Sequence, residues 1–155
     1  MAEGSKVDLI RLADGESSLE VRVRGRHMSE VLPWHDFLDA EVVVTSGFAR
    51  GRLEVRLAPD DADSCSQVLG ALAASRNVPW MDEGRAPEIR FELSGQGGVA
   101  VVVVEDVAGS GTSVRVPVCA ADGWTDEHHD RLRHVRASWP QEVVATSPGA
   151  YEWRR

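Results

Sequence analysis

Residues 19–24 read LEVRVR, and this stretch decides the class of fold. Its three apolar side chains alternate with three charged ones, which is the period of a β-strand that buries one face. The stretch VDLIRL (7–12) precedes it, and the Asp14–Gly15 pair between the two is typical of a turn because glycine accepts a positive φ. The beginning of the chain therefore predicts a β-hairpin.

Alternation continues along most of the chain. A second hairpin is expected from AEVVVT (40–45) and RLEVRLA (52–58), and three later strands are expected from EIRFEL (88–93), VAVVVVED (99–106) and TSVRVPV (112–118). The valine run of residues 101–104 does not alternate, so its strand is predicted to be central and buried on both faces. Pro117 cannot donate a ladder hydrogen bond, which places the last of these strands at an edge or a bulge.

Two segments carry a helical period instead. Residues 59–77 begin with proline and three nearby aspartates, which suit a helix N-terminus, and their apolar side chains recur on one face. A second helix is expected from a cap at Thr125 to the residue before Pro140. The order ββββαβββα predicts a two-layer α+β fold, in which a mainly antiparallel sheet of about seven strands carries both helices on one face.

The length of 155 residues fits a single domain over 1–155, with residues 1–6 expected to be flexible and 141–155 expected to form a C-terminal tail. No run of 18 apolar residues and no apolar leader segment is present, so we expect a cytoplasmic protein that does not cross a membrane. Cys65 and Cys119 match no metal or redox spacing and are expected to be reduced and buried.

The net charge of −8 is concentrated in the middle of the chain, where residues 59–108 hold 3 basic and 9 acidic side chains and so carry −6. A negative field repels phosphate backbones and attracts basic partners. We therefore expect no binding of nucleic acid, and we expect any protein partner to be basic.

The stretch WTDEHHDRLRH (124–134) holds three histidines, but its spacing favours a helix surface over a metal site. No two of these histidines are four residues apart, whereas a zinc site needs three or four convergent ligands. On a helix, His128 would lie at the margin of the face that packs on the sheet, and Asp130 could pair with His134. The glycine-rich stretches GQGG and GSGT precede strands rather than helices, so they read as turns and not as phosphate loops. We expect neither a metal nor a cofactor.

Two segments share an apolar-Pro-Trp-x-Asp pattern, VLPWHDFLDAE (31–41) and VPWMDEGRAPE (78–88). In the simpler interpretation each tryptophan closes one end of the sheet and each aspartate makes a local turn bond. In the other, the two segments form an aromatic and acidic rim that touches a partner, because interface hot spots are rich in tryptophan. The candidate binding residues in that case are Trp34, His35, Asp36, Asp60, Asp61, Trp80, Asp82, Tyr151 and Trp153.

Four stretches carry a resemblance to a known family: HDFLDAEVVVTSGFARGRLEV (35–55), PEIRFEL (87–93), VEDVAGSGTSVRVPV (104–118) and SPGAYEWRR (147–155). They resemble a family of short actinobacterial proteins that is defined only as a domain of unknown function. The resemblance implies no activity, cofactor or catalytic residue. The order of elements and the acidic character also resemble WapI-type immunity proteins, which bind and neutralise a toxin.

These observations predict a non-enzymatic interaction protein, immunity-like or regulatory, that binds a protein partner through an acidic, tryptophan-bearing surface. A small-ligand-binding or regulatory module is the first alternative, and it predicts a concave pocket with convergent polar groups. An enzyme is the second alternative, with His35 and Asp36 as its acid/base pair. The oligomeric state stays open.

Overall fold

The structure, a computed structural model, describes residues 6–81, 87–93, 99–107 and 109–154, so the expectation for residues 1–6 falls almost wholly outside it. The described elements, in chain order, are β1 (Val7–Ala13), β2 (Ser18–Arg26), η1 (Leu32–Trp34), β3 (Leu38–Thr45), β4 (Arg50–Leu57), α1 (Pro59–Ala73), β5 (Pro79–Trp80), β6 (Glu88–Leu93), β7 (Val99–Glu105), β8 (Ser113–Pro117), α2 (Trp124–Ser138), β9 (Val143–Ser147) and β10 (Ala150–Trp153).

The α+β class is confirmed, but the expectation of one sheet with about seven strands is wrong. The ten described strands form three antiparallel sheets, in the orders β1-β2-β3-β4, β5-β6-β7-β8 and β10-β9. A seven-stranded sheet would be about 34 Å wide, since strands lie about 4.8 Å apart. Two helices of about 10 Å diameter would cover only about 20 Å of its face. Two four-stranded sheets that face each other bury their apolar faces more completely.

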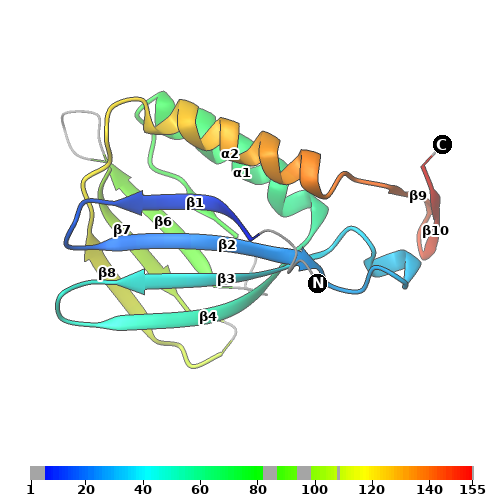
Figure 1. The fold of residues 1–155 in the computed structure, drawn as a ribbon, viewed down its shortest axis with the longest axis horizontal. Coiled ribbons are helices and arrows are strands. Elements are labelled where there is room, and N and C mark those ends of the chain that lie inside the picture. The colour runs from blue at the N-terminus through cyan, green and yellow to red at the C-terminus, as the bar shows by residue number, and fades with distance from the viewer. Residues whose placement is uncertain (1–5, 82–86, 94–98, 108, 155) are drawn as a thin grey trace.

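The core lies between these two sheets and under the helices. Buried side chains from β1 to β4 join buried side chains from β6 to β8 in one cluster. Helix α2 packs along β1, and α1 packs against α2 and β5. The helices therefore cover the side of the molecule on which β1 and β5 end their sheets (Figure 1).

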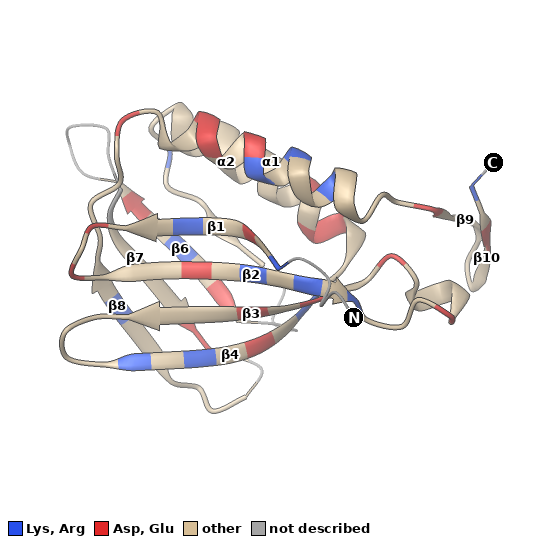
Figure 2. Cartoon of the chain, viewed as in Figure 1, with Lys and Arg blue, Asp and Glu red and all other residues tan. Residues whose placement is uncertain are grey.

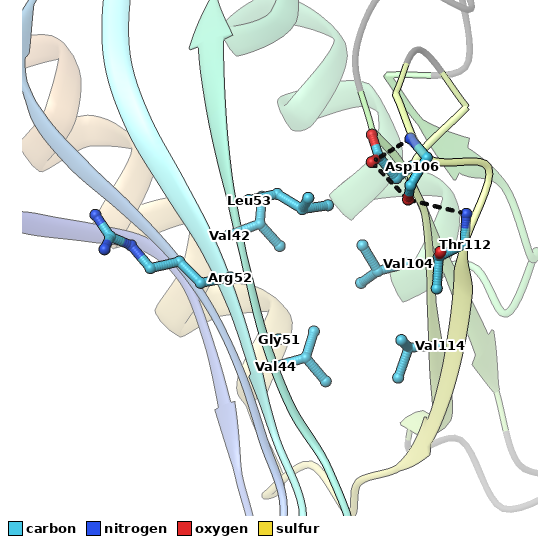
Figure 3. A pocket seen from close by; sticks show the side chains of 10 residues that line it. Val42, Val44, Gly51, Arg52, Leu53, Val104, Asp106, Thr112 and Val114 are labelled. Carbon is cyan, nitrogen blue, oxygen red and sulfur yellow. Dashed lines mark hydrogen bonds between the residues drawn. The ribbon is translucent and has the colours of Figure 1, made fainter.

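The other edges of the two sheets are β4 and β8, and residues from both of these strands line a groove. An apolar groove of about 210 Å³ lies there, with Val42 and Val44 on one wall and Val104 and Val114 on the other (Figure 3). We call it the inter-sheet groove.

Several details of the sequence prediction are confirmed. Val102, Val103 and Val104 are all buried, and β7 is an inner strand of its sheet. Pro117 ends the edge strand β8.

The helix boundaries differ from those predicted. Helix α2 begins at Trp124 after Gly123, whose φ of 76° is left-handed, so Thr125 lies in the first turn and is not the cap. Helix α1 ends at Ala73, before the predicted end at Asn77, and Ser75 then takes a positive φ of 62°.

The outer face of the first sheet carries paired charges. Basic and acidic side chains are interspersed across its four strands (Figure 2). Arg22 contacts Asp8 at 3.0 Å and also Glu20, and the buried Glu41 accepts a 2.6 Å hydrogen bond from Arg52. Much of the arginine content of this face is thus matched by carboxylates.

Among the described residues, no helix combines the length and the apolar character that crossing a membrane would require.

The two cysteines differ in exposure. Cys65 is buried as expected, and burial raises the pKa of its thiol to about 12. Cys119 is exposed, so the expectation that both thiols are buried is wrong; it follows the end of β8, outside the core.

Candidate functional site

The segment expected to be a C-terminal tail forms the hairpin β9–β10, which lies beside the connector of residues 27–37 between β2 and β3. Strand β10 contacts the short helix η1 within that connector. The two segments are more than one hundred residues apart in sequence and meet at one end of the molecule (Figure 1).

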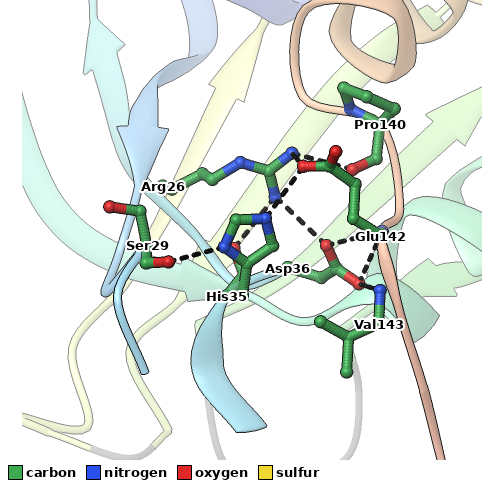
Figure 4. A network of polar contacts seen from close by, with 7 residues as sticks. All are labelled: Arg26, Ser29, His35, Asp36, Pro140, Glu142 and Val143. Atoms are coloured by element: carbon green, nitrogen blue, oxygen red, sulfur yellow. Dashed lines mark hydrogen bonds and ion pairs between the residues drawn. The ribbon is translucent and has the colours of Figure 1, made fainter. Parts of the chain in front are cut away.

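Arg26, the last residue of β2, holds these two segments together (Figure 4). One guanidinium nitrogen donates to the His35 carbonyl at 2.9 Å and to Asp36 Oδ1 at 3.1 Å. The other donates to the Pro140 carbonyl at 2.8 Å and to Glu142 Oε1 at 2.9 Å. The planar guanidinium group of arginine can donate hydrogen bonds to several acceptors at once, and the Arg26 side chain is only 12% exposed.

Asp36 fixes the beginning of the hairpin. Its carboxylate accepts hydrogen bonds from the backbone N–H of Glu142 at 3.0 Å and from that of Val143 at 2.9 Å. The side chain is 6% exposed, so its charge is matched by Arg26 and by these two amides rather than by water. Asp36 is thus fully engaged in holding two segments together.

His35 makes a second contact between the segments. Its Nδ1 lies 2.7 Å from the Ser29 carbonyl and its Nε2 lies 2.8 Å from Glu142 Oε1. Both partners are acceptors, so both hydrogen bonds form only when both ring nitrogens carry a proton. The ring also meets Trp153 edge-on, with centroids 4.6 Å apart. This geometry favours a positioning role for His35 and Asp36 over the acid/base chemistry considered from the sequence.

A groove of about 370 Å³ lies beside these contacts, between the connector, the start of α1 and the hairpin. We call it the end groove. Trp34 and Tyr151 line it, and they are 38% and 41% exposed. Trp34 packs on Phe37 with centroids 4.8 Å apart, and the Arg56 guanidinium lies 5.4 Å from the centre of the Trp34 ring. The remaining lining residues are Pro33, Asp36, Phe37, Ala58, Pro59, Asp60, Gln141, Val143 and Ala145.

The structure brings together most of the predicted binding residues. Those at this end of the molecule are Trp34, His35, Asp36, Asp60, Tyr151 and Trp153. Asp61 instead accepts a 2.8 Å hydrogen bond from the backbone N–H of Ala58 and so supports the first turn of α1.

The second Pro-Trp segment behaves differently from the first. Trp80 is 1% exposed, and its Nε1 donates to the Asp61 carbonyl at 3.0 Å. It therefore belongs to the core, as in the simpler interpretation of the pattern. Asp82 lies outside the described residues.

The histidine-rich stretch contributes to packing, as its helical spacing predicts. His128 is 1% exposed; its Nδ1 lies 2.6 Å from the Trp124 carbonyl, and its Nε2 accepts a 3.0 Å hydrogen bond from the Arg11 backbone. Burial lowers the pKa of His128, which agrees with a neutral ring that donates once and accepts once. Asp130 contacts Arg133 rather than His134. Within the described part of the chain, no three His, Cys, Asp or Glu side chains are grouped so that they could hold a metal ion.

Arg26 and Glu142 are not among the residues that the sequence predicts for this site. Arg26 continues the charged positions of an alternating strand, and Glu142 stands in a polar segment after Pro140. Neither position carries a local signal, because their contact spans 116 residues of sequence.

Comparison with known proteins gives a family but no activity. A family model described as "Family of unknown function (DUF5959)" matches residues 7–140. The chain belongs to the DUF5959 family. The matched residues include Arg26, His35 and Asp36, whereas Glu142 and the β9–β10 hairpin lie beyond them. No curated protein matches the chain.

Proposed function

We propose that this DUF5959 member is a non-enzymatic interaction protein that binds a protein partner through one end of the molecule. The supporting observation is the distribution of exposed apolar side chains. Of seven large hydrophobic residues exposed in the described chain, five lie in the connector 27–37 or in the hairpin β9–β10. These five are Met28, Val31, Trp34, Tyr151 and Trp153, and we call them the connector–hairpin surface. Clustered exposed aromatic and apolar side chains mark protein interfaces.

The hydrogen bonds that hold this surface together support the same proposal. Arg26, Asp36 and Glu142 tie the hairpin to the connector through hydrogen bonds of 2.8–3.1 Å. A surface that is already ordered loses less conformational entropy on binding, so more of its contact energy contributes to affinity. Tryptophan and tyrosine also supply a large contact area with few rotatable bonds.

The negative charge of the chain supports a basic protein as the partner. The chain carries −8, and Asp60 in the end groove forms no ion pair with any other described residue. Arg56 adds one local positive charge over Trp34, so the attraction comes chiefly from the field of the whole molecule. Association should therefore slow as salt rises, and Asp60→Asn should lower the association rate more than it raises the dissociation rate.

The test is to capture binding partners from a lysate of the host cell on three immobilised forms of the protein. Wild type is compared with the double variant Trp34→Ala/Tyr151→Ala and with the control Phe48→Ala. Phe48 is 97% exposed but lies in the β3–β4 turn, outside the connector–hairpin surface. We expect wild type and the control to retain the same partner and the double variant to lose it by at least about tenfold, as for hot-spot aromatics. A partner held equally by all three forms would contradict the proposal.

The biological class of the partner separates an immunity-like role from a regulatory one. If the captured protein is a toxin, its co-expression with wild type should restore growth, and co-expression with Trp34→Ala/Tyr151→Ala should not. If growth stays arrested with wild type, the immunity-like form of the proposal is wrong. A cytoplasmic location is part of the same proposal and is tested by fractionation of the host cell.

A further inference from the structure

The inter-sheet groove is a second concave site, and it is separate from the connector–hairpin surface. Its walls come from two different sheets, with Val44 and Leu53 on one side and Val104 and Val114 on the other (Figure 3). No residue that lines it also lines the end groove. A ligand in the inter-sheet groove would therefore contact none of the residues that line the end groove.

Gly51 keeps the inter-sheet groove open. It lies inside strand β4, where the other positions of the same face are Leu53, Val55 and Leu57. A Cβ built on Gly51 would have no atom within 4 Å, so the space that a side chain would fill is empty. Glycine weakens a strand interior, and it often marks a place where a ligand or another backbone approaches closely. Because glycine stands where the strand pattern would place an apolar side chain, it leaves empty space on the inner face of the sheet.

The groove has one acidic end. Asp106, directly after β7, lines it, and the carboxylate accepts hydrogen bonds from the backbone N–H and the hydroxyl of Ser110 at 2.9 and 3.0 Å. Asp106 forms no ion pair with a described residue. Arg52 also borders the groove, but its guanidinium points away from it (Figure 3) and pairs with Glu41 on the outer face. An apolar groove with one carboxylate that forms no ion pair with a described residue is complementary to a ligand with an apolar body and a positive charge.

We propose that the inter-sheet groove binds a small organic ammonium ion whose hydrocarbon body is one ring or a short chain. The body would lie between Val44, Leu53, Val104 and Val114, and the ammonium group would lie at Asp106. The size agrees, because apolar cavities of about 150 Å³ bind benzene, and this groove offers about 210 Å³. The open space at Gly51 admits the ring, and the charge of Asp106 selects the cation.

The binding test uses three ligands of nearly equal shape. Cyclohexylmethylammonium, cyclohexylmethanol and cyclohexanecarboxylate are titrated into the intact protein while the methyl signals of its valines and leucines are followed by NMR. We expect the ammonium ion to shift Val44, Leu53, Val104 and Val114 and to bind up to about fivefold more tightly than the alcohol, which is the upper end of the range for an exposed ion pair. The carboxylate should bind most weakly.

Two variants, each with a matched control, test the residues. Gly51→Leu should fill the groove and weaken binding of the ammonium ion at least about tenfold, since a ligand ring can no longer enter. Arg50→Leu adds the same side chain on the opposite face of the strand and should leave binding unchanged. Asp106→Asn keeps the acceptor for Ser110 and should abolish the preference for the ammonium ion over the alcohol. Glu105→Gln removes one charge from the opposite face of β7 and should preserve that preference.

Four results would each overturn the proposal. The first is that the ammonium ion shifts none of the four groove residues. The second is that Gly51→Leu binds the ammonium ion as wild type does, and the third is that the anion binds as tightly as the cation. The fourth concerns a second copy of the chain: if sedimentation shows a dimer that becomes a monomer in Gly51→Leu, the groove is a self-association interface. Binding of the partner by Gly51→Leu is a separate readout, so failure here leaves the connector–hairpin proposal standing.

Discussion

Replacement of Arg26 by methionine should release the β9–β10 hairpin from the connector. The change keeps a long side chain but removes four hydrogen bonds to the His35 and Pro140 carbonyls, Asp36 and Glu142. It also leaves the carboxylate of Asp36, 6% exposed, without its counter-charge. Two backbone amides would still donate to that carboxylate.

The size of the effect follows from this environment. Removal of one partner from a buried ion pair costs about 3–5 kcal/mol. Because Asp36 retains its two amide donors, we expect about 2–4 kcal/mol here. Val143 is the only residue of the described hairpin that is buried, so little apolar packing resists its release. The loss should therefore appear as local opening of the hairpin, not as global unfolding.

Hydrogen exchange measures this opening directly. The amides of residues 143–153 should exchange about 30- to 1000-fold faster in Arg26→Met, since about 1.4 kcal/mol corresponds to a factor of ten. Arg24→Met is the matched control, because Arg24 lies in the same strand and pairs with Glu54 across a more exposed contact of 3.3 Å. That control should cost about 0.2–1 kcal/mol and leave hairpin exchange unchanged. Exchange that rises less than about threefold in Arg26→Met, or equally in both variants, would refute this reasoning.

Three further predictions concern the core and the thiols. Burial lowers the pKa of His128, so as pH falls the unfolded state takes up this proton before the folded state does. The free energy of unfolding should therefore fall as pH drops below about 6.5. Urea titrations at several pH values measure this dependence, and His128→Leu should flatten it. Val102→Asp should prevent folding, because Val102 is 1% exposed and an unpaired buried charge costs several kcal/mol; circular dichroism and solubility report this. Iodoacetamide should alkylate Cys119 alone in the native protein and Cys65 only after denaturation, as counted by mass spectrometry.

The strands and the inner face of α2 could be predicted because their signals are local. Alternation in LEVRVR fixes which side chains of β2 are buried, and the spacing of Trp124, His128, Leu132 and Val135 fixes one helix face; all of these are buried in the structure. The division into two sheets could not be predicted in the same way. Alternation shows that a strand has a buried face, but it does not show which other strand covers that face.

The exposure of single residues at the candidate surface could not be predicted from the local sequence either. The two Pro-Trp segments have the same pattern, yet Trp34 is exposed and Trp80 is buried. The difference comes from their neighbours. Trp80 lies in the short strand β5, which packs against α1, whereas Trp34 lies in a connector next to the hairpin β9–β10. A local motif cannot contain that information, because the hairpin lies more than one hundred residues further along the chain.

The role of each carboxylate also depends on its contacts in the folded structure. The excess of carboxylates in residues 59–108 suggested a strongly acidic surface, but individual carboxylates have distinct uses. Asp61 supports the first turn of α1, and Asp63 pairs with Arg136 at 2.7 Å. Asp60 and Asp106 form no such ion pair within the described part of the chain, and each lines a different groove. A carboxylate beside apolar walls that pairs with no described cation can still contact a positively charged ligand. These two positions, rather than the net charge, therefore separate the protein-binding proposal from the ammonium-binding one.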